Sequence, residues 1–339
     1  MAVTAAARPV IRTKTAWCYA SGLVSALEGR LLSRRATLDL LAADSLDDLL
    51  VRIGQTLLLE APPEAARPFD LAEALEAAFA AYVRQFARAC PTSVVADIFL
   101  LPIEWRAFRA WVRAEALGQA LARVPGAAVP DERWADCWAS PDAEPPFDLF
   151  AQAAAAIRKA VPHDELSERH IDEITCAFEA RDVMRAARAA ASADVLCWAT
   201  TWWRLGIALD LLRTREHGWS HERYEAALAA IGAEHCDIIH VALPEHPDWR
   251  TTFVRLGLPE VIGVPDEDGV RSAAIERLID NAVTRLAHAG RSVAFGPEIV
   301  FSFLWGLRTE ALNLRLIAAG LAAGLDADAI AGDIRDAYV

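Results

Sequence analysis

Two groups of side chains have residue types and spacings that suit a metal ion. In the first group, Asp47 and Asp48 begin the Asp-Asp-x-x-Asp pattern with which helical isoprenoid enzymes hold magnesium and diphosphate, but position 51 is Val51. Aspartates also stabilise the positively polarised first turn of a helix. We therefore interpret this pair as a helix start and predict no magnesium site.

The second group consists of histidines. His217 and His221 are four residues apart, a spacing that can hold zinc on one helical face when a third ligand joins them. Gly218 follows the first histidine and favours a break in the helix. A further cluster contains His235, Cys236, Asp237 and His240. We interpret both clusters as structural and expect no metal.

Signatures of other catalytic chemistry do not fit the chain. A P-loop needs Gly-x-x-x-x-Gly-Lys-Ser/Thr to cradle phosphates, but neither Lys14 nor Lys159 follows a glycine. Ser93 and Ser302 lack the Gly-x-Ser-x-Gly context of a hydrolase nucleophile. We expect no catalytic residue, no cofactor and no direct ATP hydrolysis by this chain.

Composition narrows the classes of partner. The chain has 339 residues and a net charge of −13, so it repels nucleic-acid phosphates and suits a basic protein surface. Its six cysteines form no Cys-x-x-Cys pair, which favours reduced thiols in a cytosolic protein. No signal peptide is evident, and no apolar run reaches the ~20 uncharged residues of a membrane-spanning helix. The chain can lie against a membrane complex but not within the bilayer.

Helical signals position these residues throughout the chain. Ser45 is expected to cap a helix, residues 71–86 to form a long one, and Thr92 to cap the next. Gly296 and Pro297 should end one helix and begin another. Predicted loops span 124–130, 141–146 and 256–269, while residues 238–243 could be a short strand but more naturally form a buried helical or extended segment. The sequence predicts an all-α fold.

One helix carries polar groups that are costly to bury alone, namely Glu310, Asn313 and Arg315. The spacing Glu104 to Arg109 resembles that of Glu310 to Arg315, and each follows an apolar aromatic run. A weaker copy at 202–207 lies between them, at intervals of about 100 residues. Three helical units, at about 15–103, 104–203 and 204–339 of a single domain, would form a pseudo-threefold assembly.

Further residues repeat with these units. Arg113 follows Glu104 by nine residues, as Arg213 follows Arg204, while Asp172 and Asp280 precede the second and third copies. Four stretches then resemble one family, the C-type subunit of archaeal and bacterial A/V-type rotary ATPases, whose counterpart in the eukaryotic vacuolar enzyme (V-ATPase) is the d-type subunit. They are residues 19–33, 104–113, 280–298 and 310–339.

The sequence departs from this family's pattern at several positions. The family's asparagine is Ala107 in the first unit and Ile207 in the second, and its acid is Arg204 in the second. Leu23 and Ser25 stand where basic residues are usual in the first helix. These changes weaken the polar anchors of the first two units.

The resemblance implies an all-helical funnel that is not catalytic. It implies a central-stalk subunit, cytoplasmic and peripheral to the membrane, whose partners are shaft subunits of the D/F type and the membrane rotor ring. Both proton and sodium transport, and both synthesis and hydrolysis of ATP, stay open. The residues expected to form its structural network are Glu104, Arg109, Arg113, Asp280, Glu310, Asn313 and Arg315.

Two alternatives make different structural predictions. A soluble helical-repeat adapter with unrelated partners would form an open solenoid with a concave groove. An all-α enzyme would need clustered carboxylates that face a cavity.

Overall fold

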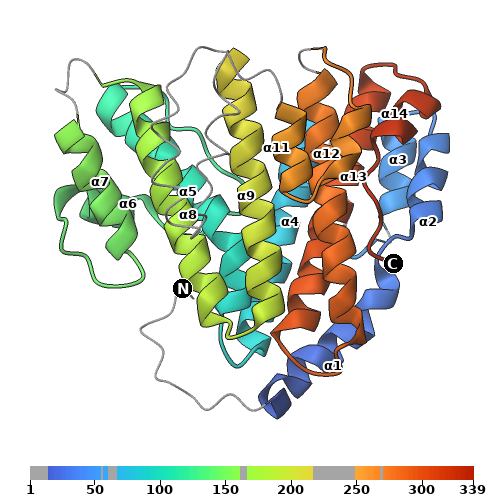
Figure 1. Ribbon diagram of the computed structural model, residues 1–339, viewed down its shortest axis with the longest axis horizontal. Helices are drawn as coiled ribbons and strands as arrows, with labels where there is room; N and C mark the ends of the chain where they lie inside the picture. Colours follow the sequence, from blue (N-terminus) through green and yellow to red (C-terminus); the bar gives the residue numbers. More distant parts are fainter. Residues whose placement is uncertain (1–13, 55, 60–66, 161–165, 217–248, 268–269) are drawn as a thin grey trace. The chain divides into compact units, whose positions relative to one another are not determined.

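Helices joined by turns and irregular segments make up the described part of the chain (Figure 1). The computed structural model describes residues 14–54, 56–59, 67–160, 166–216, 249–267 and 270–339. No strand occurs within these ranges, so the prediction of an all-α fold is confirmed. The possible strand at 238–243 lies outside them.

The chain divides into two compact units. The first unit contains residues 92–262, and the second combines residues 12–91 with 263–339. Because the first unit is inserted between the two parts of the second, the second unit is assembled from distant parts of the sequence. The division into three units and the pseudo-threefold funnel stay predictions.

The first unit is built around α5 and α8, which pack along each other. A cluster of aromatic rings packs between α5, α6 and α7. Trp105 stacks on Phe150 with the ring centroids 4.1 Å apart, and the ring centroids of Phe108 and Trp134 are 5.5 Å apart. The bounds of its α-helices are α5 Val94–Leu117, α6 Asp131–Ala139, α7 Asp148–Ala160, α8 Glu168–Ala189, α9 Ala193–Glu216 and α11 Trp249–Arg255.

The second unit is built around α13, which is buried on nearly all sides along most of its length. Apolar residues occupy most of its faces, and such a helix needs a buried position. On α4, apolar residues recur every three or four positions and pack against α13. The ring centroids of Phe86 on α4 and Phe303 on α13 are 5.0 Å apart. The α-helices are α1 Cys18–Leu27, α2 Arg34–Asp39, α3 Leu46–Ile53, α4 Pro68–Ala89, α12 Val270–Ala287, α13 Pro297–Ala322 and α14 Ala327–Asp333, with the 3₁₀ helix η7 at His288–Ser292.

Local capping explains where several helices begin. Ser45 caps α3 by accepting a hydrogen bond from the Asp48 N–H, and Pro297 opens α13 after Gly296, as predicted. The prediction that Thr92 caps α5 is wrong, since α5 begins one residue later, after Ser93. The Ser93 hydroxyl donates instead to the Asp97 side chain.

The predicted loops are largely confirmed. Residues 124–130 and 141–146 contain no helix. Within 256–269, the structure adds the short 3₁₀ helix η6 at Pro259–Gly263. A Pro-Glu start is compatible with such a turn, because proline tolerates the first helical position.

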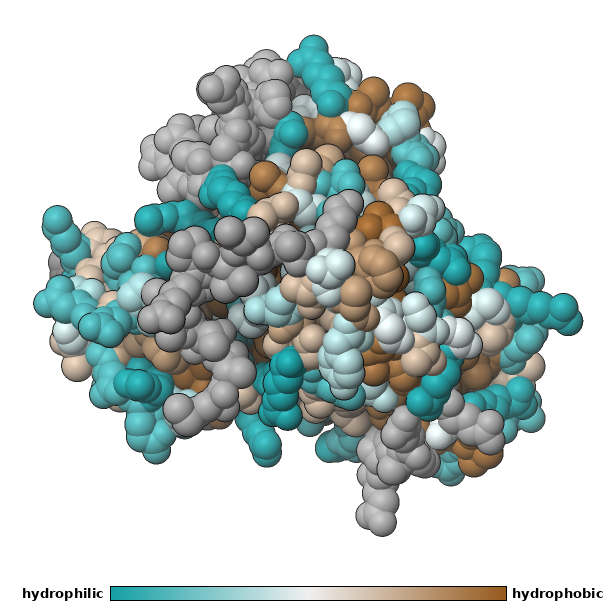
Figure 2. Space-filling model, turned by 90° about the horizontal axis from the view of Figure 1, so that it is seen from below, coloured by the Kyte–Doolittle hydropathy of each residue, from teal (hydrophilic) through white to brown (hydrophobic). Residues whose placement is uncertain are grey.

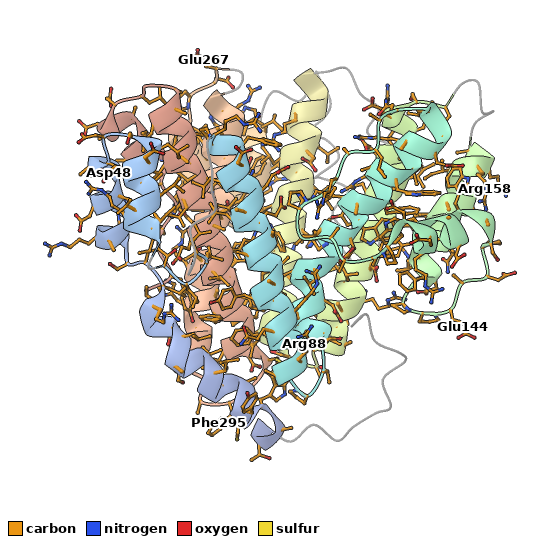
Figure 3. The ribbon with its side chains drawn as sticks, turned by 180° about the vertical axis from the view of Figure 1, so that it is seen from behind. Asp48, Arg88, Glu144, Arg158, Glu267 and Phe295 are labelled. Carbon is orange, nitrogen blue, oxygen red and sulfur yellow. The ribbon has the colours of Figure 1, made fainter. Side chains whose placement is uncertain are left out.

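No helix in the described ranges is long and apolar enough to cross a membrane. On the face shown in Figure 2, apolar side chains occur in groups separated by hydrophilic ones. Within the second unit, Asp48 and Glu267 lie at one end and Phe295 lies at the other (Figure 3).

Candidate functional site

A buried carboxylate on α12 organises polar contacts in the second unit. Asp280 is 2% exposed, and its two oxygens bind different guanidinium groups. Oδ1 lies 2.9 Å from Nη1 of Arg308, and Oδ2 lies 2.6 Å from Nε of Arg335. The Arg308 guanidinium also covers the Trp305 ring at 4.7 Å. These contacts tie α12 to α13 and to the extended residues after α14.

Asn313 on α13 uses both ends of its amide. Its Oδ1 accepts from the Arg335 N–H at 2.9 Å, and its Nδ2 donates to the Arg335 carbonyl at 3.2 Å. An asparagine amide is both donor and acceptor, so it can satisfy both backbone groups of one residue. Asn313 thereby holds residues 334–339 against α13.

Glu310, one helical turn earlier, binds a segment from the opposite end of the sequence. Its Oε2 accepts the Leu32 N–H at 2.7 Å, and the side chain is 6% exposed. Its buried Oε1 has no hydrogen-bond partner among the residues that the structure describes. Burial raises the pKa of Glu310 to about 7, although the bond from Leu32 opposes this shift.

In the first unit, Glu104 has a similar role on α5. It is 4% exposed, and its carboxylate accepts the Ala128 N–H at 3.0 Å and the Val129 N–H at 3.3 Å. Glu104 and Glu310, which the proposed repeat aligns, thus both bind the backbone of another segment. The contact with residues 128–129 fixes the loop between α5 and α6.

Two arginines of α5 bind acids of α8. Nη1 of Arg109 lies 2.8 Å from the Glu179 carboxylate, and Nη2 of Arg113 lies 2.6 Å from Asp172. Burial opposes the charge of Arg109, but the nearby carboxylate of Glu179 raises the pKa of Arg109 above its usual value. These pairs fix how α5 and α8 lie along each other.

A third link joins the same two helices and was not predicted. Trp105 donates from Nε1 to Asp182 at 3.2 Å, and Asp182 also accepts from Arg185 at 2.7 Å. The sequence of α8 could have indicated this link, because Asp172, Glu179 and Asp182 are spaced by seven and three residues. This spacing places three acids on one helical face.

Arg315 differs from the other predicted network residues because it is exposed. Residues two apart on a helix lie on nearly opposite sides, so Arg315 points away from the face that holds Asn313. Glu310, Asn313 and Asp280 contribute to contacts within one unit, and Glu104, Arg109 and Arg113 to contacts within the other. Whether all seven act as one functional network stays a prediction.

Of the two sequence patterns that suit a metal ion, the structure describes only the aspartate pair. Ser45 caps the helix that contains Asp47 and Asp48, and Asp48 pairs with Arg52 at 2.9 Å, which agrees with a helix start. No group of metal-ligating side chains occurs within the described residues. The histidine clusters at 217–221 and 235–240 lie outside those residues.

The contacts described above hold helices together. The contacts of the buried side chains join α5 with α8, α12 with α13 and with residue 335, and α13 with residues 32 and 335. Breaking one member of a buried pair leaves an uncompensated charge, which costs about 3–5 kcal/mol. The arrangement therefore resists sliding of one helix along its neighbour.

Comparison with known proteins finds a family match over one region of the chain. Residues 252–332 match the model of the ATP synthase (C/AC39) subunit family, which is the family that the sequence resembles. The matched range contains Asp280, Glu310 and Asn313, whereas the first-unit contacts lie outside it. No curated protein matches the chain.

Proposed function

We propose that this chain, whose residues 252–332 match the model of the ATP synthase (C/AC39) subunit family, is the non-catalytic central-stalk subunit of an A/V-type rotary ATPase. It joins the rotating shaft of the catalytic head to the membrane rotor ring. In this way it couples ion transport to the hydrolysis or synthesis of ATP. Its partners are the shaft subunits of the D/F type and the ring, and it lies on the cytoplasmic side, peripheral to the membrane.

The family match over α12, α13 and α14 is the observation that carries this proposal. These helices contain the contact of Asp280 with Arg308, and Arg335, which also binds Asp280, follows the matched range. A subunit that transmits torque must keep its helices in register under load. Buried ion pairs between neighbouring helices support this role, because sliding would separate the charges in a medium of low dielectric constant.

Charge and hydropathy support the same assignment. A net charge of −13 favours association with basic surfaces of partner subunits, since complementary charge guides encounter and orientation. The finding that no described helix could span a bilayer is consistent with attachment to a membrane complex through another subunit.

The first test is affinity purification of the full chain from cells that naturally make it. Membranes would be solubilised gently, and the bound proteins identified by mass spectrometry against an untagged control. The proposal predicts recovery of shaft and ring subunits of a rotary ATPase. Recovery of other soluble proteins, with no ATPase subunit although the enzyme is present in the membranes, would refute it and favour a helical-repeat adapter.

A second test separates a stalk role from mere co-purification. Cells that lack the chain should show ATP hydrolysis by the catalytic head in the soluble fraction and not on membranes, and expression of the full chain should restore membrane attachment. The Arg34→Ala variant is the control for a harmless substitution and should restore attachment as the unchanged chain does. Arg34 is exposed, and its partner Asp336 is exposed as well. Unchanged attachment in cells without the chain would contradict a linking role.

A further inference from the structure

The residues after α14 form an extended segment that lies on two helices. Residues 334–339 contain no helix and run back along α13 after α14 (Figure 1). Ile334 is 3% exposed and Tyr338 is 2% exposed, so two side chains of this short segment are buried. A segment without regular structure of its own is therefore held by the surface beneath it.

Two asparagine side chains bind the backbone of this segment. Asn313 of α13 bonds both the N–H and the carbonyl of Arg335, and Asn281 of α12 accepts the Asp336 N–H at 2.8 Å. Backbone bonds of this kind provide affinity for an extended peptide without regard to its sequence. The donors and acceptors belong to helices that are complete without the segment.

Separate contacts select the side chains. The Arg335 guanidinium lies 2.6 Å from Asp280 and 3.5 Å from Glu276, both on α12. Tyr338 follows Ile334 by four residues, and the centroid of its ring lies 5.3 Å from Cζ of the Arg291 guanidinium. Arg291 also donates from Nη1 to the Tyr338 carbonyl at 3.0 Å. The surface thus distinguishes a basic residue and an aromatic one.

Gly306 of α13 provides the space for the aromatic ring. A Cβ atom built on Gly306 would lie 2.6 Å from Cγ of Tyr338, much closer than two carbon atoms can approach. No such crowding exists at Gly22 on α1, where an added Cβ meets no atom of the described part of the chain within 4 Å. Alanine substitutions at Gly306 and at Gly22 therefore provide a matched test of the ring's position.

We propose that α12, η7 and α13 form a binding site for an extended peptide, which residues 334–339 fill in cis as a separable latch. The ligand has an apolar residue, then arginine, and an aromatic residue three positions after the arginine. Release of residues 335–339 breaks bonds to side chains and leaves the bond from the Ile334 N–H to the Ala331 carbonyl, which closes α14. The remaining exposed pair, Arg34 with Asp336, adds little, because water and salt screen exposed ion pairs.

Covalent attachment keeps this site occupied. A segment joined to its site by a short connection has an effective concentration on the order of millimolar. An added peptide of micromolar affinity would therefore bind poorly to the unchanged chain at ordinary concentrations. Weakening the cis segment should open the same site to the peptide.

The test uses the full chain with Arg335→Ala and Tyr338→Ala, and a fluorescent synthetic peptide of residues 334–339. Fluorescence anisotropy should show at least tenfold tighter peptide binding to this double variant than to the unchanged chain. Adding Gly306→Ala should abolish the gain, whereas adding Gly22→Ala should preserve it. A double variant that folds but binds no peptide, or binds a scrambled peptide equally well, would overturn the proposal.

Hydrogen exchange in the unchanged chain provides a second test that needs no substitution. The N–H groups of Arg335 and Asp336 should exchange at least tenfold faster than those in the middle of α13, because the latch opens without unfolding the helix. Exchange at the same slow rate as α13 would overturn separability. Loss of helical circular dichroism in the double variant would overturn it too, since a separable latch leaves the helices folded.

Discussion

The buried carboxyl group of Glu310 should make the stability of the second unit depend on pH. Burial raises its pKa from an ordinary value of 4.5 to about 7. Because the folded pKa lies above the unfolded one, the stabilising contribution is fully present below pH 4.5 and is lost as the pH rises through about 7. Each pKa unit corresponds to about 1.4 kcal/mol, so ionisation lowers the free energy of unfolding by about 3 kcal/mol at pH 8.

The Glu310→Gln variant isolates this effect. Glutamine cannot ionise, yet its carbonyl oxygen can accept the Leu32 N–H bond as the carboxyl does. We expect the variant to match the unchanged chain near pH 4.5 and to exceed its free energy of unfolding by about 3 kcal/mol at pH 8. Urea unfolding followed by far-ultraviolet circular dichroism at both pH values measures the difference.

A control variant guards against a general effect of removing negative charge. Glu115 is exposed on α5, so Glu115→Gln should change the free energy of unfolding by no more than about 0.5 kcal/mol at either pH. A Glu310→Gln effect that is equal at both pH values would refute the reasoning. So would a variant that is less stable than the unchanged chain at pH 8.

Three further substitutions test the packing and the polar contacts. Asp280→Asn should lower the free energy of unfolding by about 3–5 kcal/mol in urea titrations. Arg34→Ala, which breaks an exposed pair, should lower it by less than about 1 kcal/mol, and similar losses for the two variants would contradict the buried network. Glu104→Ala should speed hydrogen exchange of the Ala128 and Val129 N–H groups, and unchanged exchange would show that these bonds do not hold the loop. Gly320→Ala should cost about 1–3 kcal/mol in thermal unfolding, because its Cβ would lie 2.6 Å from Cγ1 of Ile330. Gly332→Ala is its control, since a Cβ there meets no described atom within 4 Å, and equal costs would contradict the close packing of α13 and α14.

Sequence patterns predicted what depends on neighbouring residues. The all-α class followed from helical periodicity, and the starts of α3 and α13 followed from Ser45 and the Gly296-Pro297 pair. The exposure of Arg315 also follows from local geometry once Asn313 is assigned to the buried face. The prediction of Thr92 as a cap was wrong because a helix start is specified only to within a residue or two by such signals.

Partners of the candidate residues were beyond local patterns. Glu310 meets the N–H of Leu32, a group that every residue except proline has, so no residue type marks it as a partner. Arg109 and Arg113 were identified, but their acids on α8 were not paired with them, because helix packing brings these residues together across distant parts of the sequence. Side-chain identity marked where polar groups needed partners, and the fold supplies them.

The insertion of the first unit between the two parts of the second affects the order in which the chain can fold during synthesis. The apolar face of α4 emerges from the ribosome roughly 200 residues before α13, against which Phe86 and Phe303 pack. At about 5–20 residues per second, α4 waits on the order of ten seconds or more for that partner, while the first unit can close around its own helices. The nascent chain therefore exposes an apolar helix for much of its synthesis, and a chaperone that binds such surfaces would find its substrate there.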